Sequence, residues 1–237
     1  MTRPRRRFGS AILLALLILG ARAAHGSIVF MQSAQGASTG DANTVSATFT
    51  SQPGAGNLLV AVAGNLAASS PTTPTGWSVA IDESANAPGQ VIFYRIAGLT
   101  EPSTVTVNGY GTATRLGLHV YEYRGIAYGA PLDQTASNTG NGTALSTGTT
   151  GTTGQPVELV VAAFVIDAAG SLDGWTNGLT ERRDFANGGA APQAGYAGAD
   201  LVVSDVTGYG TDATATVAGN WRGQVVTFKA RRVMFVE

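Results

Sequence analysis

The two histidines of the chain, His25 and His119, have the widest catalytic repertoire of its side chains. A Ser-His-Asp hydrolase would have to use His119, which lies inside an apolar stretch, and no Gly-x-Ser-x-Gly nucleophile turn stands between a strand and a helix. We therefore interpret His119 as a structural histidine. His25 would suit the copper site that some β-sandwich monooxygenases form at an N-terminal histidine. That site requires cleavage directly after Ala24, so a solvent-exposed terminus is the favoured interpretation.

Paired carboxylates would indicate a glycoside hydrolase, because two carboxyl groups must flank the bond to be cut. In sandwich glucanases they project from one strand, but no Glu-x-Asp-x-x-Glu pattern occurs here. Glu122 is the one acidic residue within an apolar strand-like stretch, and strand alternation places it on the same face as Arg124. An edge ion pair between these two residues is favoured over acid–base catalysis.

Calcium is the one cofactor that the sequence leaves open, because exported sandwiches often bind it with loop oxygens. Asp41 and Asn43 lie in one turn-like segment, and Asp82 and Asn86 lie in another. Neither segment has the spacing of a known calcium loop, and Asx turns explain the same residues equally well.

Aromatic side chains could hold a carbohydrate, because a flat ring stacks on the apolar face of a pyranose. The candidates are Tyr110, Tyr196 and Tyr209, in glycine-rich segments, and Trp77 and Trp175, each of which follows a glycine. The two tryptophans occupy equivalent places in two similar segments, which favours packing over sugar contact for them.

Short apolar runs predict the strands that would position these residues. Residues 58–63 and 159–164 are continuous apolar runs bounded by polar residues, glycine and proline, which is typical of strands buried on both faces. Residues 116–124 alternate between two faces that both look covered, and residues 125–142 are expected to be a crossover. Beyond residue 23 no sustained helical periodicity occurs. The predicted fold class is all-β, a double-sheet antiparallel β-sandwich of jelly-roll or concanavalin-like type.

The chain also shows signs of an internal duplication. Gln155-Pro156, Leu159-x-Val161-Ala162 and Gly174-Trp175 match Gln52-Pro53, Leu58-x-Val60-Ala61 and Gly76-Trp77 in the same order. The pseudo-repeats would span about residues 44–125 and 143–230. Neither has enough apolar faces to close a core comfortably alone, so we expect one fused sandwich domain over residues 24–230. Residues 231–237 would form an edge strand or a docking tail.

The first 23 residues indicate export. A basic head precedes an apolar run of about ten residues and the small-x-small end Ala21-Arg22-Ala23, which is typical of a cleaved secretory signal peptide and too short for a membrane span. Arg5-Arg6-Arg7 also fits a twin-arginine signal, which is the less favoured route. We therefore expect a secreted, periplasmic or cell-surface protein without a membrane span after cleavage.

The charge of the expected mature chain excludes one class of partner. Loss of residues 1–23 removes five arginines, which leaves nine of the 14 basic residues against 15 acidic ones. Without a basic stripe, nucleic acid is not an expected partner. The chain has no cysteine, so neither disulfides nor thiolate metal sites support the fold.

The pattern of structural motifs resembles a type of exported bacterial β-sandwich domain found in large surface and extracellular proteins. The resemblance rests on residues 56–60, Gly76-Trp77, residues 121–125, residues 131–133 and residues 226–229, and it covers most of the mature chain. It implies a fold but no catalytic or binding residue.

Two functional hypotheses follow. The favoured one is a non-enzymatic exported module that binds carbohydrate or another surface polymer, or that serves an adhesive or structural role. It is favoured because no nucleophile, acid pair or metal cluster is recognisable. The alternative is a polysaccharide-active enzyme with a jelly-roll fold. The sequence leaves the oligomeric state open.

Overall fold

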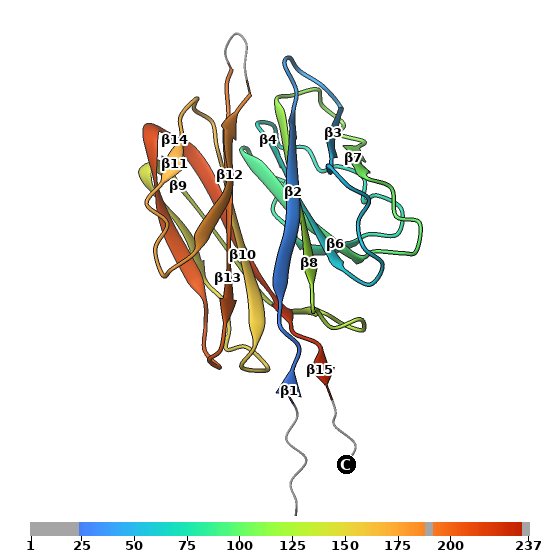
Figure 1. Ribbon diagram of the computed structural model, residues 1–237. Helices are drawn as coiled ribbons and strands as arrows, with labels where there is room; N and C mark the ends of the chain where they lie inside the picture. Colours follow the sequence, from blue (N-terminus) through green and yellow to red (C-terminus); the bar gives the residue numbers. More distant parts are fainter. Residues whose placement is uncertain (1–23, 188–191, 234–237) are drawn as a thin grey trace, which may run out of the picture.

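The computed structural model describes residues 24–187 and 192–233, and all of their regular secondary structure is β-strand (Figure 1). The strands are β1 (Ala24–His25), β2 (Val29–Ala37), β3 (Thr44–Thr48), β4 (Leu58–Asn65), β5 (Ser78–Asp82), β6 (Gly89–Ile96), β7 (Thr104–Asn108), β8 (Leu116–Arg124), β9 (Leu132–Thr149), β10 (Glu158–Ile166), β11 (Leu172–Asp173), β12 (Thr180–Ala186), β13 (Gly195–Val203), β14 (Gly210–Lys229) and β15 (Arg232–Val233). The expected signal peptide, residues 1–23, lies outside the described residues.

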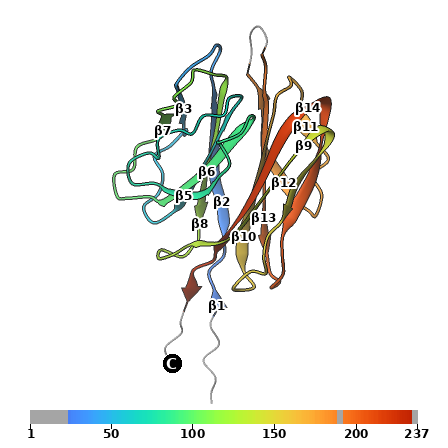
Figure 2. The same ribbon diagram turned by 180° about the vertical axis from the view of Figure 1, so that it is seen from behind.

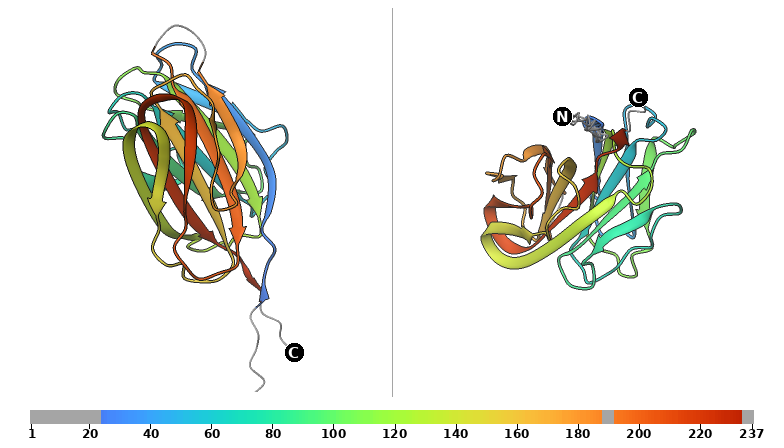
Figure 3. Two further views of the ribbon diagram at one scale, coloured as in Figure 1. Left: turned by 90° about the vertical axis from the view of Figure 1, so that its left-hand side faces the viewer. Right: turned by 90° about the horizontal axis from the view of Figure 1, so that it is seen from below.

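Two large sheets face each other (Figure 3). The first has the order β2-β8-β4-β6-β5, and the second has the order β11-β14-β10-β13-β12 with β9 also paired to β14. Strands β3 and β7 form a separate pair, as do β1 and β15, and every named pairing is antiparallel. This arrangement confirms the predicted fold class, an all-β antiparallel sandwich. Among the described residues, none belongs to a helix that could cross a membrane.

The two apolar runs form the central strands β4 and β10, and every residue in both is buried. Alternate residues of β4 serve different cores, since successive side chains point to opposite faces of a sheet. Leu58 and Val60 pack between the two large sheets with Leu159 of β10. Leu59 and Ala61 instead pack under the β3–β7 pair. The prediction that both faces of these strands are covered is therefore confirmed.

The expected crossover at residues 125–142 is wrong in part, because the segment already contains the first half of β9 (Figure 2). β9 pairs with β14 along most of its length and is only partly buried over residues 132–137. Its Ser-, Thr- and Asn-rich sequence has little apolar alternation, since an edge strand needs neither two covered faces nor two neighbours. At the end of the chain, Arg232–Val233 forms β15, which pairs with β1. Residues 234–237 lie outside the described residues.

The two halves of the chain show the same strand order. The order β2-β8-β4-β6-β5 corresponds to β9-β14-β10-β13-β12 when β9 and β14 are each counted as two consecutive strands and the two-residue β11 is left out. β3 pairs with β7 in the first half, while the distal part of β9 pairs with the first part of β14 in the second. Gly76 and Gly174, which precede the two matched tryptophans, both have left-handed φ values, +81° and +67°.

Candidate functional site

Two of the five aromatic candidates lie in the interior. Tyr110 and Tyr196 are only 2% and 1% exposed, and burial raises the pKa of both hydroxyls well above the ordinary value. The hydroxyl of Tyr196 donates to the carbonyl of Arg115 at 3.2 Å. Neither ring is available to a ligand in this structure, so we leave both out of the proposed binding surface. Their glycine-rich surroundings suggested surface turns, but both rings are buried, and glycines of other strands make room for the ring of Tyr196. A Cβ on Gly117 would lie 2.6 Å from three ring atoms of Tyr196.

Trp77 lies alone on the first half of the molecule. It is partly buried against the core beneath β3 and β7, and the guanidinium of Arg95 lies 5.9 Å from its ring centroid. Its contacts support the packing role that its position in the sequence favours.

Trp175 and Tyr209, in contrast, both lie on the outer face of the second sheet. Both are partly buried against the same apolar cluster, which includes Leu179 and Leu201. The indole nitrogen of Trp175 donates to Glu181 at 2.9 Å, and the Tyr209 hydroxyl donates to the carbonyl of Asp205 at 2.7 Å. These bonds hold both side chains while part of each stays accessible to solvent.

Grooves flank the loop that carries Trp175. One, of about 280 Å³, is lined by Tyr209 together with Asn177, Leu179, Leu201, Gly208 and Gly210. The other, of about 270 Å³, is lined on its loop side by Gly174 and Thr176 and otherwise by Ala144, Leu145, Ser146, Asp212, Ala213 and Thr214. Apolar surface beside amide and hydroxyl groups is the combination that binds a sugar ring.

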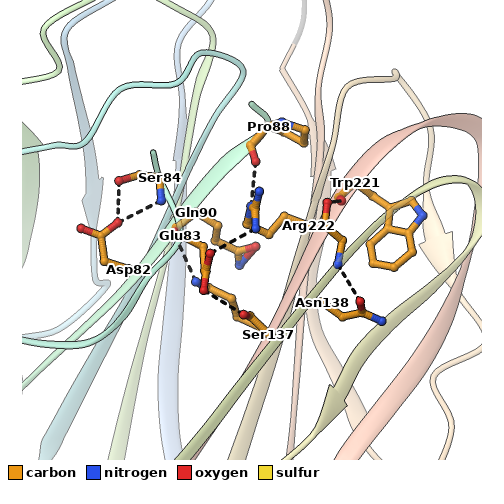
Figure 4. Close-up of polar contacts among 11 residues, drawn as sticks. Asp82, Glu83, Ser84, Pro88, Gln90, Ser137, Asn138, Trp221 and Arg222 are labelled. Carbon is orange, nitrogen blue, oxygen red and sulfur yellow. Dashed lines mark hydrogen bonds and ion pairs between the residues drawn. The ribbon is translucent and has the colours of Figure 1, made fainter. Parts of the chain in front are cut away.

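Three of the four calcium candidates have contacts with other protein groups. Asp41 lies 3.5 Å from Arg115, and Asn43 donates to the carbonyl of Tyr110. Asp82 accepts bonds from the backbone and hydroxyl of Ser84, the Asx-type turn visible in Figure 4. An ion pair and hydrogen bonds therefore occupy Asp41, Asn43 and Asp82 in this structure, and Asn86 is exposed. Among the residues that the structure describes, no three His, Asp or Glu side chains are placed to hold a metal.

Beside Asp82, a buried polar seam joins the two large sheets (Figure 4). Arg222 of β14 donates to the carbonyl of Pro88 at 2.9 Å and lies 3.3 Å from Glu83. Ser137 of β9 donates to Glu83 from the same side at 2.9 Å. These contacts connect segments more than 50 residues apart in the sequence. We therefore interpret the seam as a structural contact that holds the two halves together.

His119 fits the structural role predicted for it. It is 1% exposed, lies 3.0 Å from the Tyr121 hydroxyl and packs on the ring of Phe185 at 4.8 Å. Burial, with a further contribution from Arg183, lowers the pKa of His119 to about 3. A neutral, enclosed imidazole cannot reach a substrate. The side chain of His25 lies outside the described part of the structure.

The expected ion pair of Glu122 is wrong. Glu122 is 2% exposed and accepts bonds from the Gly54 amide at 2.7 Å, Asn57 at 2.5 Å and Gln32 at 2.6 Å, whereas Arg124 is exposed. Strand alternation gave the correct face, but the loop before β4 folds over it and supplies the hydrogen-bond donors. Glu122 thus anchors that loop.

Sequence reasoning missed a second buried acid, Glu158, at the start of β10. It is fully buried, and the Thr227 hydroxyl and the Asp133 carboxyl are the polar groups beside it. Burial raises the pKa of Glu158 to about 7, and the nearby Asp133 carboxylate adds to the rise. Asp133 lies 3.2 Å from Lys229 and accepts a bond from Gly154. Although burial alone would raise the pKa of Asp133, these two partners lower it. The one sequence signal for the burial of Glu158 was its position directly before an apolar run.

The comparisons with known proteins do not add a relative. No protein-family model matches the chain, and neither a curated protein nor a solved structure matches it. The function is therefore argued from the geometry of the described residues.

Proposed function

We propose that the protein is an exported, non-enzymatic β-sandwich module that binds carbohydrate or another surface polymer. The observation that carries this proposal is the partly exposed pair Trp175 and Tyr209, with a groove on each side of the Trp175 loop. Rings fixed by hydrogen bonds offer a sugar a flat surface at little cost in conformational entropy. The secretory pattern of residues 1–23 supports an extracellular, periplasmic or surface location.

The proposal includes an origin by duplication. The shared strand order and the left-handed glycine before each matched tryptophan support two copies of one unit, about residues 44–125 and 143–230. On this view Trp77 kept the packing role, while Trp175 gained a ligand surface through its neighbour Tyr209.

Glycan-array and polysaccharide pull-down measurements on the purified protein test the binding site. We expect Trp175→Ala and Tyr209→Ala to weaken capture about tenfold, which corresponds to losing ~1.4 kcal/mol of stacking and burial. Trp77→Ala is the matched control from the other half and should leave capture unchanged. Thermal melting of each variant separates lost binding from lost folding, and Tyr209→Phe should keep most of the affinity because its ring remains.

Several results would contradict this function. If no glycan is captured, with calcium or with a chelator, carbohydrate is not the ligand. If Trp77→Ala alone abolishes capture, the site is misplaced. N-terminal sequencing of the secreted protein should find Ala24 as the first residue, and retention of residues 1–23 would contradict export by cleavage.

The alternative proposal is a polysaccharide-active enzyme, and one observation favours it. Glu158 and Asp133 are neighbouring carboxyl groups whose pKa values move in opposite directions, as in a general acid beside an ionised carboxylate. The complete burial of Glu158 argues against it, because a substrate would have to displace the residues that cover it. The enzyme would be established if the protein releases reducing ends from a polysaccharide and Glu158→Gln abolishes that release. Capture without release would leave the binding module.

A further inference from the structure

A pocket is lined by residues that follow β1 and precede β15, the two strands that pair at one end of the molecule in Figure 1. It shares no lining residue with the two grooves beside the Trp175 loop. It has a volume of about 440 Å³, and most of its lining residues belong to the segments that follow β1, precede β4 and follow β8. Three exposed side chains also line it: Arg124, Tyr128 and Arg231. We call it the terminal pocket.

Two of these three side chains are cations without an acidic partner. Within residues 24–187 and 192–233, the side chain of Arg124 makes no ion pair or hydrogen bond, and that of Arg231 bonds only to Tyr128. Other cations of the chain do have carboxylates within 4 Å, namely Arg95, Arg115, Arg182, Arg222 and Lys229. Two unpaired guanidinium groups on one concave surface create a local positive potential that attracts an anion.

The guanidinium of Arg231 is already held in place. It lies 5.3 Å from the ring centroid of Tyr128, and its Nη1 donates to the Tyr128 hydroxyl at 2.7 Å. The ring in turn rests on Gly56, whose φ is +81° and where a Cβ would come within 2.9 Å of the ring. Most of the entropic cost of ordering this arginine is therefore met before a ligand arrives, and its other N–H groups stay free to donate.

We propose that the terminal pocket binds the carboxylate of an acidic saccharide, such as a uronic acid unit of a polysaccharide. A carboxylate accepts two parallel bonds from the planar fork of a guanidinium, and Arg124 supplies a second positive charge to the same pocket. The exposed Ser27 on the wall offers a partner to ring hydroxyls, and a volume of about 440 Å³ accommodates one or two sugar rings. This site rests on observations independent of the Trp175 and Tyr209 surface.

The test is calorimetric titration of the purified protein with galacturonic acid oligomers and with their methyl esters at physiological salt. The acid form should bind at least tenfold more tightly than the ester, because esterification removes the charge and keeps the sugar. Arg124→Gln and Arg231→Gln should each weaken binding about tenfold, the value of one lost charge-assisted bond. Tyr128→Phe removes the acceptor that orients Arg231 and should weaken binding about threefold without altering the melting temperature.

Arg232→Gln is the matched control. Arg232 is exposed at the same end of the molecule and carries the same charge, but it does not line the pocket. Its substitution should change affinity less than twofold. Equal binding of acid and ester, or an equal loss for Arg232→Gln, would overturn the proposal, as would inorganic sulfate competing as well as free galacturonate. Neutral-glycan capture that Tyr209→Ala leaves unchanged, with acid binding intact, would contradict only the Trp175 and Tyr209 surface.

Discussion

At the scale of single residues, burial sets the protonation state of groups that lie in the interior. The carboxyl group of Glu158 has an ordinary pKa of 4.5 and a pKa of about 7 in the folded protein. Between these two pH values the native state keeps a proton that the unfolded chain releases. Stability from this group is present below pH 4.5 and is lost as pH rises to about 7. His119 works in the opposite direction. Its pKa falls from 6.5 to about 3, so its contribution is lost as pH falls below 6.5.

The two effects overlap in the wild type, so a variant is needed to separate them. We expect Glu158→Gln to remove the pH-dependent contribution of Glu158. The free energy of unfolding of the wild type, relative to that of this variant, should therefore fall by about 1–3 kcal/mol between pH 5 and pH 7.5. Urea denaturation at several pH values measures this difference. A difference that stays constant with pH would show that Glu158 is ionised in the folded protein. Asp133, whose pKa is lowered, titrates below this window and does not disturb it.

At the scale of the strands, the sequence predicts an element well where apolar residues define it. β4, β8 and β10 are central, covered on both faces, and their bounds agree closely with the apolar runs. β9 was missed because an edge strand with one neighbour can be built from Ser, Thr and Asn. The anchoring of Glu122 was missed for a related reason, since its donors come from a loop that alternation says nothing about.

The candidate site was predictable only in part. Tyr209 and Trp175 were predicted from residue type. That both side chains pack against one apolar cluster depends on how the loop after β11 folds over the second sheet. The terminal pocket left no sequence signal, because Arg124, Tyr128 and Arg231 come from the end of β8, a loop and the segment before β15. Residues far apart in the sequence become a site only through strand pairing.

Packing between strands gives a prediction at the same scale. The ring of Tyr196 from β13 lies over β4 and β8 at Gly64 and Gly117, where an added Cβ would approach the ring to 2.8 and 2.6 Å. Gly117→Ala should therefore destabilise the fold by about 1–3 kcal/mol, the usual cost of overpacking a closed core. Gly129→Ala is the control, because a Cβ there meets nothing within 4 Å. Equal denaturation midpoints for the two variants would show that the ring can shift freely.

At the scale of the whole molecule, the two halves share one interior rather than touching as separate domains. Leu58 and Val60 of the first half and Leu159 and Phe228 of the second belong to one buried cluster. The polar seam around Arg222 closes the same interface beside Pro88 and Glu83 (Figure 4). Neither half can expose its face of this core without losing burial worth ~25 cal/mol per Å² of apolar surface. Unfolding should therefore be a single transition.

Arg222→Gln tests whether the apolar core or the polar seam provides this cooperativity. The substitution removes the cation beside Glu83 and leaves the Pro88 carbonyl without its donor, so we expect a loss of about 2–4 kcal/mol with one transition retained. Arg95 is more exposed than Arg222, and its partner Glu101 keeps the Gly98 amide as a donor, so Arg95→Gln should cost less than about 1 kcal/mol. Scanning calorimetry distinguishes the cases. Two separate transitions in Arg222→Gln would mean that the seam, and not the shared core, couples the halves, because the apolar contacts are unchanged in that variant.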